Sequence, residues 1–216
     1  MQVEQGLHAD IFASANLAHL ETLRRAGLVH SPRTFAHNRL VIAVQRHSPL
    51  QQASELVAAQ RVVLGTAQVP VGAYARTMLA RANMDSPDFS KRVLRHVVSE
   101  EPNVRLTLAK VSLGQADAAI VYQSDLVHAP QSQAGEHMKP KRDGLRAIQL
   151  PAAWQVEARY AASRLISSHK QDIAIKWMKF ISGPIGQEIL TKHGFIPASP
   201  PTAARPRPVN AAGEAR

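Results

Sequence analysis

The stretch 62–80 constrains the fold most, because it is typical of a buried strand, a loop of small residues and the start of a helix. Pro70 suits the first helical position, where its missing N–H costs nothing, and it leaves the N–H of Val71 without an intrahelical acceptor. Gly72 would let a ligand approach the backbone closely, and no acidic residue precedes Arg76 in this stretch. The positive end of the helix dipole therefore predicts an anion site. An ordinary turn whose first amides face water fits the same residues.

Short apolar runs alternate with helical patterns along most of the chain. Besides the strand that opens 62–80, such runs predict strands at 9–15, 40–44, 118–122, 147–151 and 159–166. Capping residues, prolines and glycines predict helices over 16–27, from 48, from 70, and over 86–94, 102–114, 168–181 and 184–194. This alternation implies βαβ units and a mostly parallel sheet.

A second helix start resembles the first. In Glu101-Pro102-Asn103-Val104, proline again occupies the expected first position and leaves the N–H of Val104 free. Tyr122 ends the strand at 118–122, so its hydroxyl could enter the crevice beyond the carboxyl ends of the strands, where open α/β sheets bind ligands. A strand-end ring packed under a loop is the alternative for Tyr122. Glu100 and Glu101 would repel an anion unless their side chains point outward.

The chain is strongly basic, with a formal net charge of +10 and a pI near 10.5. Its basic residues come in small scattered groups, and only 5% of its residues are aromatic, so base-stacking surfaces are not expected. We therefore predict a solvated basic surface and no nucleic-acid partner. No apolar run approaches the length of a membrane span, and Met1 to Gly6 has no features of a signal peptide.

Catalytic patterns are weak in this sequence. The ten histidines are spread singly and there is no cysteine, so neither a zinc site nor thiolate chemistry is expected. The sequence lacks a dinucleotide fingerprint, a Walker loop and a nucleophile elbow. Ser14 and Ser124-Asp125 could belong to a hydrolase triad, but nothing in the sequence positions a histidine beside them, and turn or capping roles fit better. We predict no catalytic residue, no cofactor and no bound metal ion.

Several motifs in order resemble the molybdate-binding proteins of bacterial ABC importers, which belong to the type II periplasmic solute-binding class. The matching motifs run from about Gly6 to about Pro197, and they are Gly6 with Ala9-Asp10-Ile11-Phe12-Ala13-Ser14-Ala15, Asn38-Arg39-Leu40-Val41, Val69-Pro70-Val71-Gly72 with Tyr74-Ala75, Glu101-Pro102-Asn103-Val104-Arg105, Gly114 with Ala116-Asp117-Ala118, Val121-Tyr122 with Asp125, and Gly194-Phe195.

The resemblance implies a non-catalytic function, the capture of molybdate or tungstate for an ABC permease. In that family, uncharged donors hold a tetrahedral oxyanion between two lobes. Carried over residue by residue, the ligand-binding groups are the backbone N–H of Val71, the backbone N–H of Val104 and the hydroxyl of Tyr122. The resemblance also implies a periplasmic monomer.

The same resemblance predicts how the chain divides. We expect an α/β protein of the two-lobed type II class, in which 1–43 and 151–197 form one incomplete lobe, 44–150 form a complete second lobe and 198–216 form a disordered tail. The hinge is expected at the crossover strands near 40–44 and 147–151. Family members begin with two further strand–loop units, each carrying an anion-binding serine, before the part that matches Gly6. The expectation is thus an N-terminally truncated chain that has lost its export signal and binds molybdate weakly.

Two other functions remain as alternatives at this point. An effector-binding domain of a transcription regulator has a similar fold, although no helix-turn-helix accompanies it here. A small hydrolase would need a nucleophile with a histidine within hydrogen-bond reach.

Overall fold

The computed structural model describes residues 3, 5–6, 8–127 and 144–198. The tail predicted over 198–216, apart from Ala198, lies outside the described residues. The elements follow one another along the chain as β1 (Ile11–Ser14), α1 (Leu17–Arg25), β2 (Arg33–Gln45), η1 (Ala53–Ala58), β3 (Val62–Gly65), α2 (Pro70–Ala82), α3 (Phe89–Leu94), β4 (Val97–Glu101), α4 (Val104–Ser112), β5 (Ala118–Tyr122), α5 (Gln123–Val127), β6 (Leu145–Gln149), β7 (Glu157–Arg164), α6 (Gln171–Ser182), α7 (Pro184–Lys192) and β8 (Ile196–Pro197).

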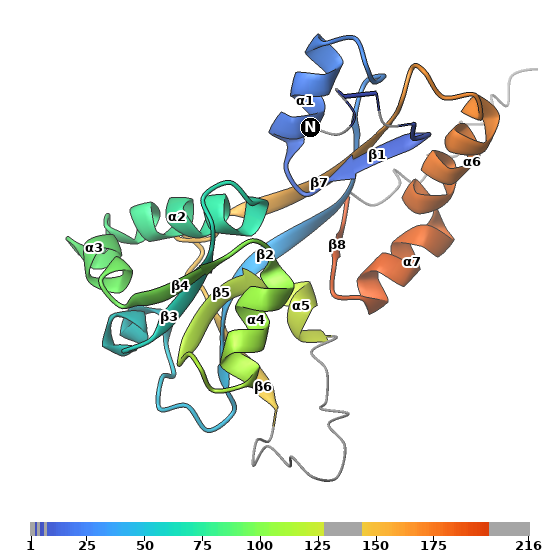
Figure 1. Cartoon of the computed structure of the whole chain (residues 1–216). Helices are drawn as coiled ribbons and strands as arrows, with labels where there is room; N and C mark the ends of the chain where they lie inside the picture. The colour runs from blue at the N-terminus through green and yellow to red at the C-terminus, as the bar shows by residue number, and fades with distance from the viewer. Residues whose placement is uncertain (1–2, 4, 7, 128–143, 199–216) are drawn as a thin grey trace, which may run out of the picture.

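The long strand β2 divides the molecule into two lobes. Its first half pairs with β7 as far as Arg39, and its second half pairs with β5 and β6 from Leu40 onward. The first lobe holds β1, β7, β8, α1, α6 and α7, and the second holds β3 to β6 with α2 to α5. Figure 1 shows β2 and β7 running from one group of elements to the other.

The strand order is β1-β7-β2-β5-β3-β4, with β6 and β8 also paired to β2. Parallel pairing, which was expected for most of the sheet, holds only for β3 with β4 and with β5 among the described strands, and β1 pairs antiparallel with β7. The pairs that β2 makes with β5, β6, β7 and β8 are antiparallel, because β2 enters the second lobe from the first and runs against its neighbours.

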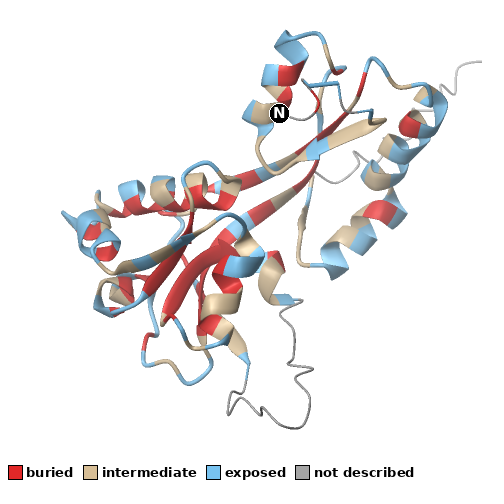
Figure 2. Cartoon of the chain, viewed as in Figure 1, coloured by how far each residue is buried: buried red, intermediate tan, exposed pale blue. Residues whose placement is uncertain are grey.

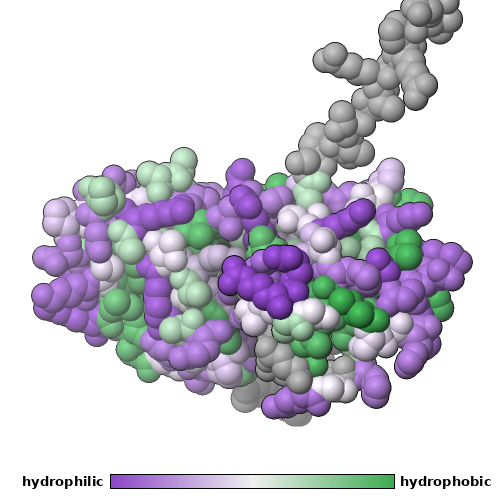
Figure 3. All heavy atoms as spheres, turned by 90° about the horizontal axis from the view of Figure 1, so that it is seen from above, coloured by the Kyte–Doolittle hydropathy of each residue, from purple (hydrophilic) through white to green (hydrophobic). Residues whose placement is uncertain are grey.

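Helices cover both faces of the second lobe's sheet. On one face, Leu40, Ile42 and Val44 pack with apolar residues of α2, and on the other, Val41 and Ala43 pack with α4. Alternate residues of a strand point to opposite faces, so a strand covered on both sides is apolar throughout. Figure 2 shows these strands as the most continuously buried part of the molecule. From above, hydrophilic residues cover most of the surface (Figure 3).

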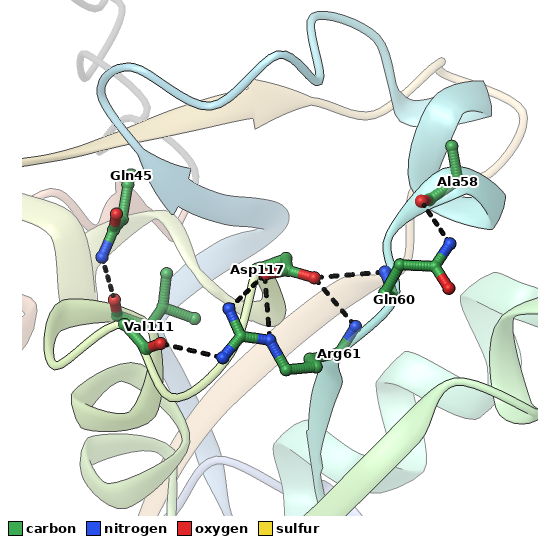
Figure 4. A network of polar contacts seen from close by, with 7 residues as sticks. Gln45, Ala58, Gln60, Arg61, Val111 and Asp117 are labelled. Atoms are coloured by element: carbon green, nitrogen blue, oxygen red, sulfur yellow. Dashed lines mark hydrogen bonds and ion pairs between the residues drawn. The ribbon is translucent and has the colours of Figure 1, made fainter.

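An ion pair fixes the amino edge of this sheet. Arg61 precedes β3 and Asp117 precedes β5, and their side chains meet at 2.6 Å between Nη2 and Oδ1. Asp117 also accepts the backbone N–H groups of Gln60 and Arg61, and Arg61 Nη1 donates to the carbonyl oxygen of Gly114 (Figure 4). Arg61 and Asp117 therefore neutralise each other and tie the segments before β3 and β5 together.

Several local expectations are wrong in detail. The helix expected from residue 48 is the 3-10 helix η1, which starts only at Ala53 because the Glu55 carboxylate accepts the N–H groups of Gln51 and Gln52. Ser168 does not cap α6; its hydroxyl accepts the N–H of Lys170, and the helix begins at Gln171.

β2 is longer than expected, and neither β4 nor β8 was expected. β2 begins at Arg33 rather than near Leu40, because polar residues at 33–34 and 37–39 interrupt its first half. β4 was not expected, since its residues alternate between half-buried and exposed positions, with Val98 56% exposed. No continuous apolar run therefore marks either segment, and in β4 the reason is that one face lies in the solvent.

Candidate functional site

Three strands end at one edge of the second lobe. Gly65, at the end of β3, lies opposite Glu101, at the end of β4, and β5 runs parallel to β3 on its other side. α2 begins after β3, α4 begins after β4, and Tyr122 ends β5. The structure therefore brings Val71, Val104 and Tyr122, the three residues predicted to bind the ligand, to the same edge.

The turn from β3 into α2 leaves no room for a side chain at position 72. A Cβ on Gly72 would lie 2.0 Å from the carbonyl oxygen of Thr66 and 2.3 Å from that of Gly65. Arg76 Nη1 donates to the carbonyl oxygens of Gly65 at 2.9 Å and Gly72 at 3.0 Å, which holds the helix against the strand end. Glycine was expected at position 72 because it would let a ligand approach the backbone. In the structure, glycine is needed there because the backbone of Gly65 and Thr66 occupies the space of a Cβ.

The first turns of α2 and α4 contain amide groups that precede the helical hydrogen-bond ladder. In α2 the ladder begins with the N–H of Ala73, so the N–H of Val71 has no acceptor within the helix. In α4 the Asn103 side chain accepts the N–H of Leu106 at 3.0 Å, and the N–H of Val104 precedes the ladder. Asn103 is the cap of α4, so Pro102 lies before the helix. The expectation that Pro102 occupies the first helical position is therefore wrong.

Tyr122 supplies a buried hydroxyl at the same edge. The residue is 4% exposed, and its Oη has no hydrogen-bond partner. A buried hydroxyl without a partner costs about 1–3 kcal/mol, so the site is arranged for an acceptor that the protein does not itself supply. Burial raises the pKa of Tyr122, which keeps the group a hydrogen-bond donor.

The rings of all three tyrosines of the chain pack together at this edge. The ring of Tyr122 stands edge-on to Tyr74 of α2 at 6.5 Å between centroids and to Tyr160 of β7 at 6.0 Å. Tyr74 and Tyr160 were not predicted as site residues. The rarity of tyrosine in the sequence was the one available signal, since their positions in separate segments say nothing of their proximity.

A buried amide lies behind the tyrosines. Asn38 of β2 is fully buried; its Nδ2 donates to the hydroxyl of Ser124 at 2.7 Å, and its Oδ1 accepts the N–H of Arg39 at 3.0 Å. Its side chain also hydrogen-bonds the hydroxyl of Tyr160. Ser124 is therefore part of a structural network and is not positioned as a nucleophile.

The acidic residues near this edge are neutralised by partners. Glu100 pairs with Arg76 at 2.5 Å, and Glu101 lies 3.8 Å from Lys110 and accepts the hydroxyl of Ser99. These pairs remove the repulsion that the two glutamates would exert on an anion. Arg76 serves both to hold the turn and to neutralise Glu100.

Asp125 contacts Tyr122 directly through its carboxylate. Its Oδ2 accepts the backbone N–H of Tyr122 at 2.9 Å. Burial raises the pKa of Asp125 to about 6, against the opposing effects of that hydrogen bond and of the charge of Arg105.

Comparison with known proteins decides the family. The family model described as bacterial extracellular solute-binding protein matches residues 1–196. The chain belongs to this family. The molybdate-binding protein ModA of Mycobacterium bovis is 28% identical to this solute-binding protein over 198 residues, which are 90% of this chain and 68% of that relative.

Solved structures show the same fold. The periplasmic molybdate-binding protein of Azotobacter vinelandii superposes with a TM-score of 0.71 at 18% identity, covering 90% of this chain and 81% of that one. The sulfate-binding protein SubI of Mycobacterium tuberculosis superposes with a TM-score of 0.73 at 16% identity, covering 90% and 70%. The two-lobed type II fold predicted from the sequence is confirmed for this solute-binding protein.

One sequence expectation about the hydrolase alternative needs correction. His19 Nδ1 lies 3.4 Å from the hydroxyl of Ser14, so a histidine does stand beside a serine. That oxygen already accepts the N–H of Asn16 at 3.1 Å, and 3.4 Å is long for a nucleophile and its base. The arrangement is a turn before α1, as expected for Ser14.

Metal sites and membrane spans were also sought in this solute-binding protein. Among the described residues, no three histidine, aspartate or glutamate side chains are grouped so that they could hold a metal ion. In the same part of the chain, no helix has both the length and the apolar character needed to cross a bilayer.

Proposed function

We propose that this solute-binding protein is the substrate-binding component of an ABC importer and that it captures molybdate or tungstate. The observation that carries the proposal is the buried, unpartnered hydroxyl of Tyr122 at the edge where α2 and α4 begin. The likeness to ModA over 90% of the chain supports the choice of oxyanion.

The proposed donors suit a fully deprotonated anion. The N–H of Val71, the N–H of Val104 and the hydroxyl of Tyr122 donate without accepting in return, and the first turns of two helices add a partial positive charge. Molybdate and tungstate carry no proton at neutral pH, whereas hydrogen phosphate would also need an acceptor. Selectivity against sulfate would then depend on the size of the cavity.

The site performs capture and release, with no bond made or broken in the ligand. Because the proposed donors are uncharged, the anion can leave without separating from a buried cation, which suits delivery to a permease. We further propose that the protein acts as a monomer in the periplasm and binds no nucleic acid.

The two lobes form the basis of the proposed mechanism. Residues 1–43 with 151–197 would move against 44–150, and β2 offers a pivot where its pairing changes from β7 at Arg39 to β5 and β6 at Leu40–Val41. Val71, Val104 and Tyr122 belong to the second lobe, so closure would bring the first lobe over the anion that they hold.

A thermal-shift panel tests the proposal. The product of the complete open reading frame that encodes these 216 residues is titrated with molybdate, tungstate, sulfate and phosphate. A ligand that binds only the folded state raises the melting temperature. We expect saturable stabilisation by molybdate and tungstate at concentrations where sulfate and phosphate have little effect. Stabilisation by sulfate or phosphate but not by molybdate would overturn the proposal, as would no response to any of the four.

A further inference from the structure

Arg76 joins three elements around the start of α2. Its Nη1 donates to the carbonyl oxygen of Gly65, the last residue of β3, at 2.9 Å and to that of Gly72, in the first turn of α2, at 3.0 Å. Its Nη2 donates to Oε1 of Glu100 in β4 at 2.5 Å. A guanidinium Nη carries two hydrogens, so the two carbonyl groups use both hydrogens of Nη1. One side chain thus ties a strand end, a helix start and the neighbouring strand together.

The residues that Arg76 holds are those against which Val71 packs. A Cβ on Gly65 would lie 2.7 Å from Cγ1 of Val71 and 3.0 Å from the backbone nitrogen of Gly72, so the first turn of α2 rests directly on the end of β3. The Val71 side chain is buried in this contact. The direction of the Val71 N–H therefore depends on how α2 lies against Gly65, and the two bonds from Arg76 Nη1 fix that arrangement.

The same side chain reaches the strand that leads to the second amide. The N–H of Thr66, which follows β3, donates to the carbonyl oxygen of Glu101 at 2.9 Å. Arg76 holds the preceding residue, Glu100. Glu101 ends β4, and the next helix, α4, begins at Val104. A backbone bond and the Arg76–Glu100 ion pair thus join the start of α2 to the strand before α4, and together they set the separation of the two helix starts.

We propose that Arg76 is a positioning residue of the oxyanion site, which holds the N–H of Val71 at a fixed place relative to the N–H of Val104 without contacting the anion itself. The proposal rests on the function proposed above and deepens it. Groups that bind one ligand together must be held within about 0.5 Å of the productive geometry. Because the charge of Arg76 is paired with Glu100, its effect on the anion is exerted through this geometry.

Calorimetric titration of molybdate into Arg76→Met tests the proposal, with Arg61→Met as the matched control. Arg61 makes the same kinds of bond at the other end of β3, to the carbonyl oxygen of Gly114 and the carboxylate of Asp117. We expect the dissociation constant to rise at least about tenfold in Arg76→Met, which corresponds to about 1.4 kcal/mol, and to stay within about twofold in Arg61→Met. Thermal unfolding of the ligand-free variants measures the stability that each has lost. A rise in Arg76→Met no larger than that in Arg61→Met would overturn the proposal.

A second variant separates positioning from charge and does not depend on the folding of Arg76→Met. Glu100→Ala removes the partner of Arg76 Nη2 at a side chain that is 44% exposed. If Arg76 acted on the anion through its charge, loss of the Glu100 carboxylate would tighten molybdate binding, because a negative charge near the site would be gone. Positioning predicts the opposite sign, a dissociation constant raised about threefold, which is within the range of an exposed ion pair. A dissociation constant that is unchanged or lowered would overturn the role of Arg76.

The outcomes of these titrations separate the role of Arg76 from the proposed function. If the unmodified protein does not bind molybdate, the function fails. If the unmodified protein binds molybdate and Tyr122→Phe weakens that binding, while Arg76→Met and Glu100→Ala bind as the unmodified protein does, the function stands and the role of Arg76 fails.

Discussion

The hydroxyl of Tyr74 donates a 3.0 Å hydrogen bond to the carbonyl oxygen of Ala15, which joins α2 of the second lobe to the loop after β1 in the first. The two residues are 59 positions apart in the chain. Because the bond crosses between the lobes, it holds α2 against the loop after β1.

Removal of this bond should loosen the contact between the lobes. Tyr74→Phe keeps the ring beside Tyr122 and loses only the hydroxyl, so we expect the free energy of unfolding to fall by about 0.5–1.5 kcal/mol. Urea denaturation at neutral pH measures the change. An unchanged midpoint would mean that water replaces the hydroxyl at Ala15 without loss.

The Gln155 side chain hydrogen-bonds the backbone of β2 at the pivot. Its Oε1 accepts the N–H of Leu40 at 2.9 Å and its Nε2 donates to the carbonyl oxygen of Leu40 at 3.1 Å, where β2 changes partners. Leu40 is fully buried. Gln155→Ala should therefore cost about 2–4 kcal/mol of stability, because both backbone groups lose their partner. Gln123→Ala, at an exposed position, should change stability by less than about 0.5 kcal/mol, and similar effects of the two variants would contradict this role.

The turn before α2 should tolerate no side chain at position 72. In Gly72→Ala the new Cβ would meet the carbonyl oxygens of Thr66 and Gly65, so the helix must move away from β3. We expect a loss of about 3 kcal/mol or more in thermal or urea unfolding. Ala80→Gly, on the exposed side of the same helix, should cost only about 1 kcal/mol. Equal losses in the two variants would show that the turn can relax.

Asp125 should make stability depend on pH. Its pKa is raised to about 6 in the folded protein from an ordinary value of 3.8, so between these values the folded state holds a proton that the unfolded state has lost. The contribution of Asp125 is thus most favourable below pH 4 and is lost as the pH rises to 6. Relative to Asp125→Asn, the unmodified protein should lose about 1–3 kcal/mol between pH 4 and pH 7. Parallel pH profiles for the two proteins would contradict the raised pKa.

The sequence predicted the buried strands and several helix starts well for a physical reason. Strands such as β3 and β5 are buried on both faces and so are continuously apolar, and the cap Asn16 and the proline Pro70 mark helix starts by local chemistry alone. Elements with one solvent face, such as β4, lack that signal.

The residues of the candidate site also fall into those that the sequence could predict and those that it could not. Val71, Val104 and Tyr122 could be predicted because each stands at the end of a strand or the start of a helix, and these positions converge in any sheet with parallel neighbours. Tyr160 and Asn38 could not, because their approach to Tyr122 depends on β2 and β7 crossing between the lobes.

Calorimetric titration of molybdate into the unmodified protein and into Tyr122→Phe tests the central claim most directly. The variant keeps the ring and its packing, and removes a hydroxyl that is buried without a partner. A hydrogen bond to a charged group contributes about 1.5–3 kcal/mol, so the dissociation constant should rise by about tenfold to 150-fold. An unchanged dissociation constant would contradict the claim, because it would remove Tyr122 from the oxyanion site.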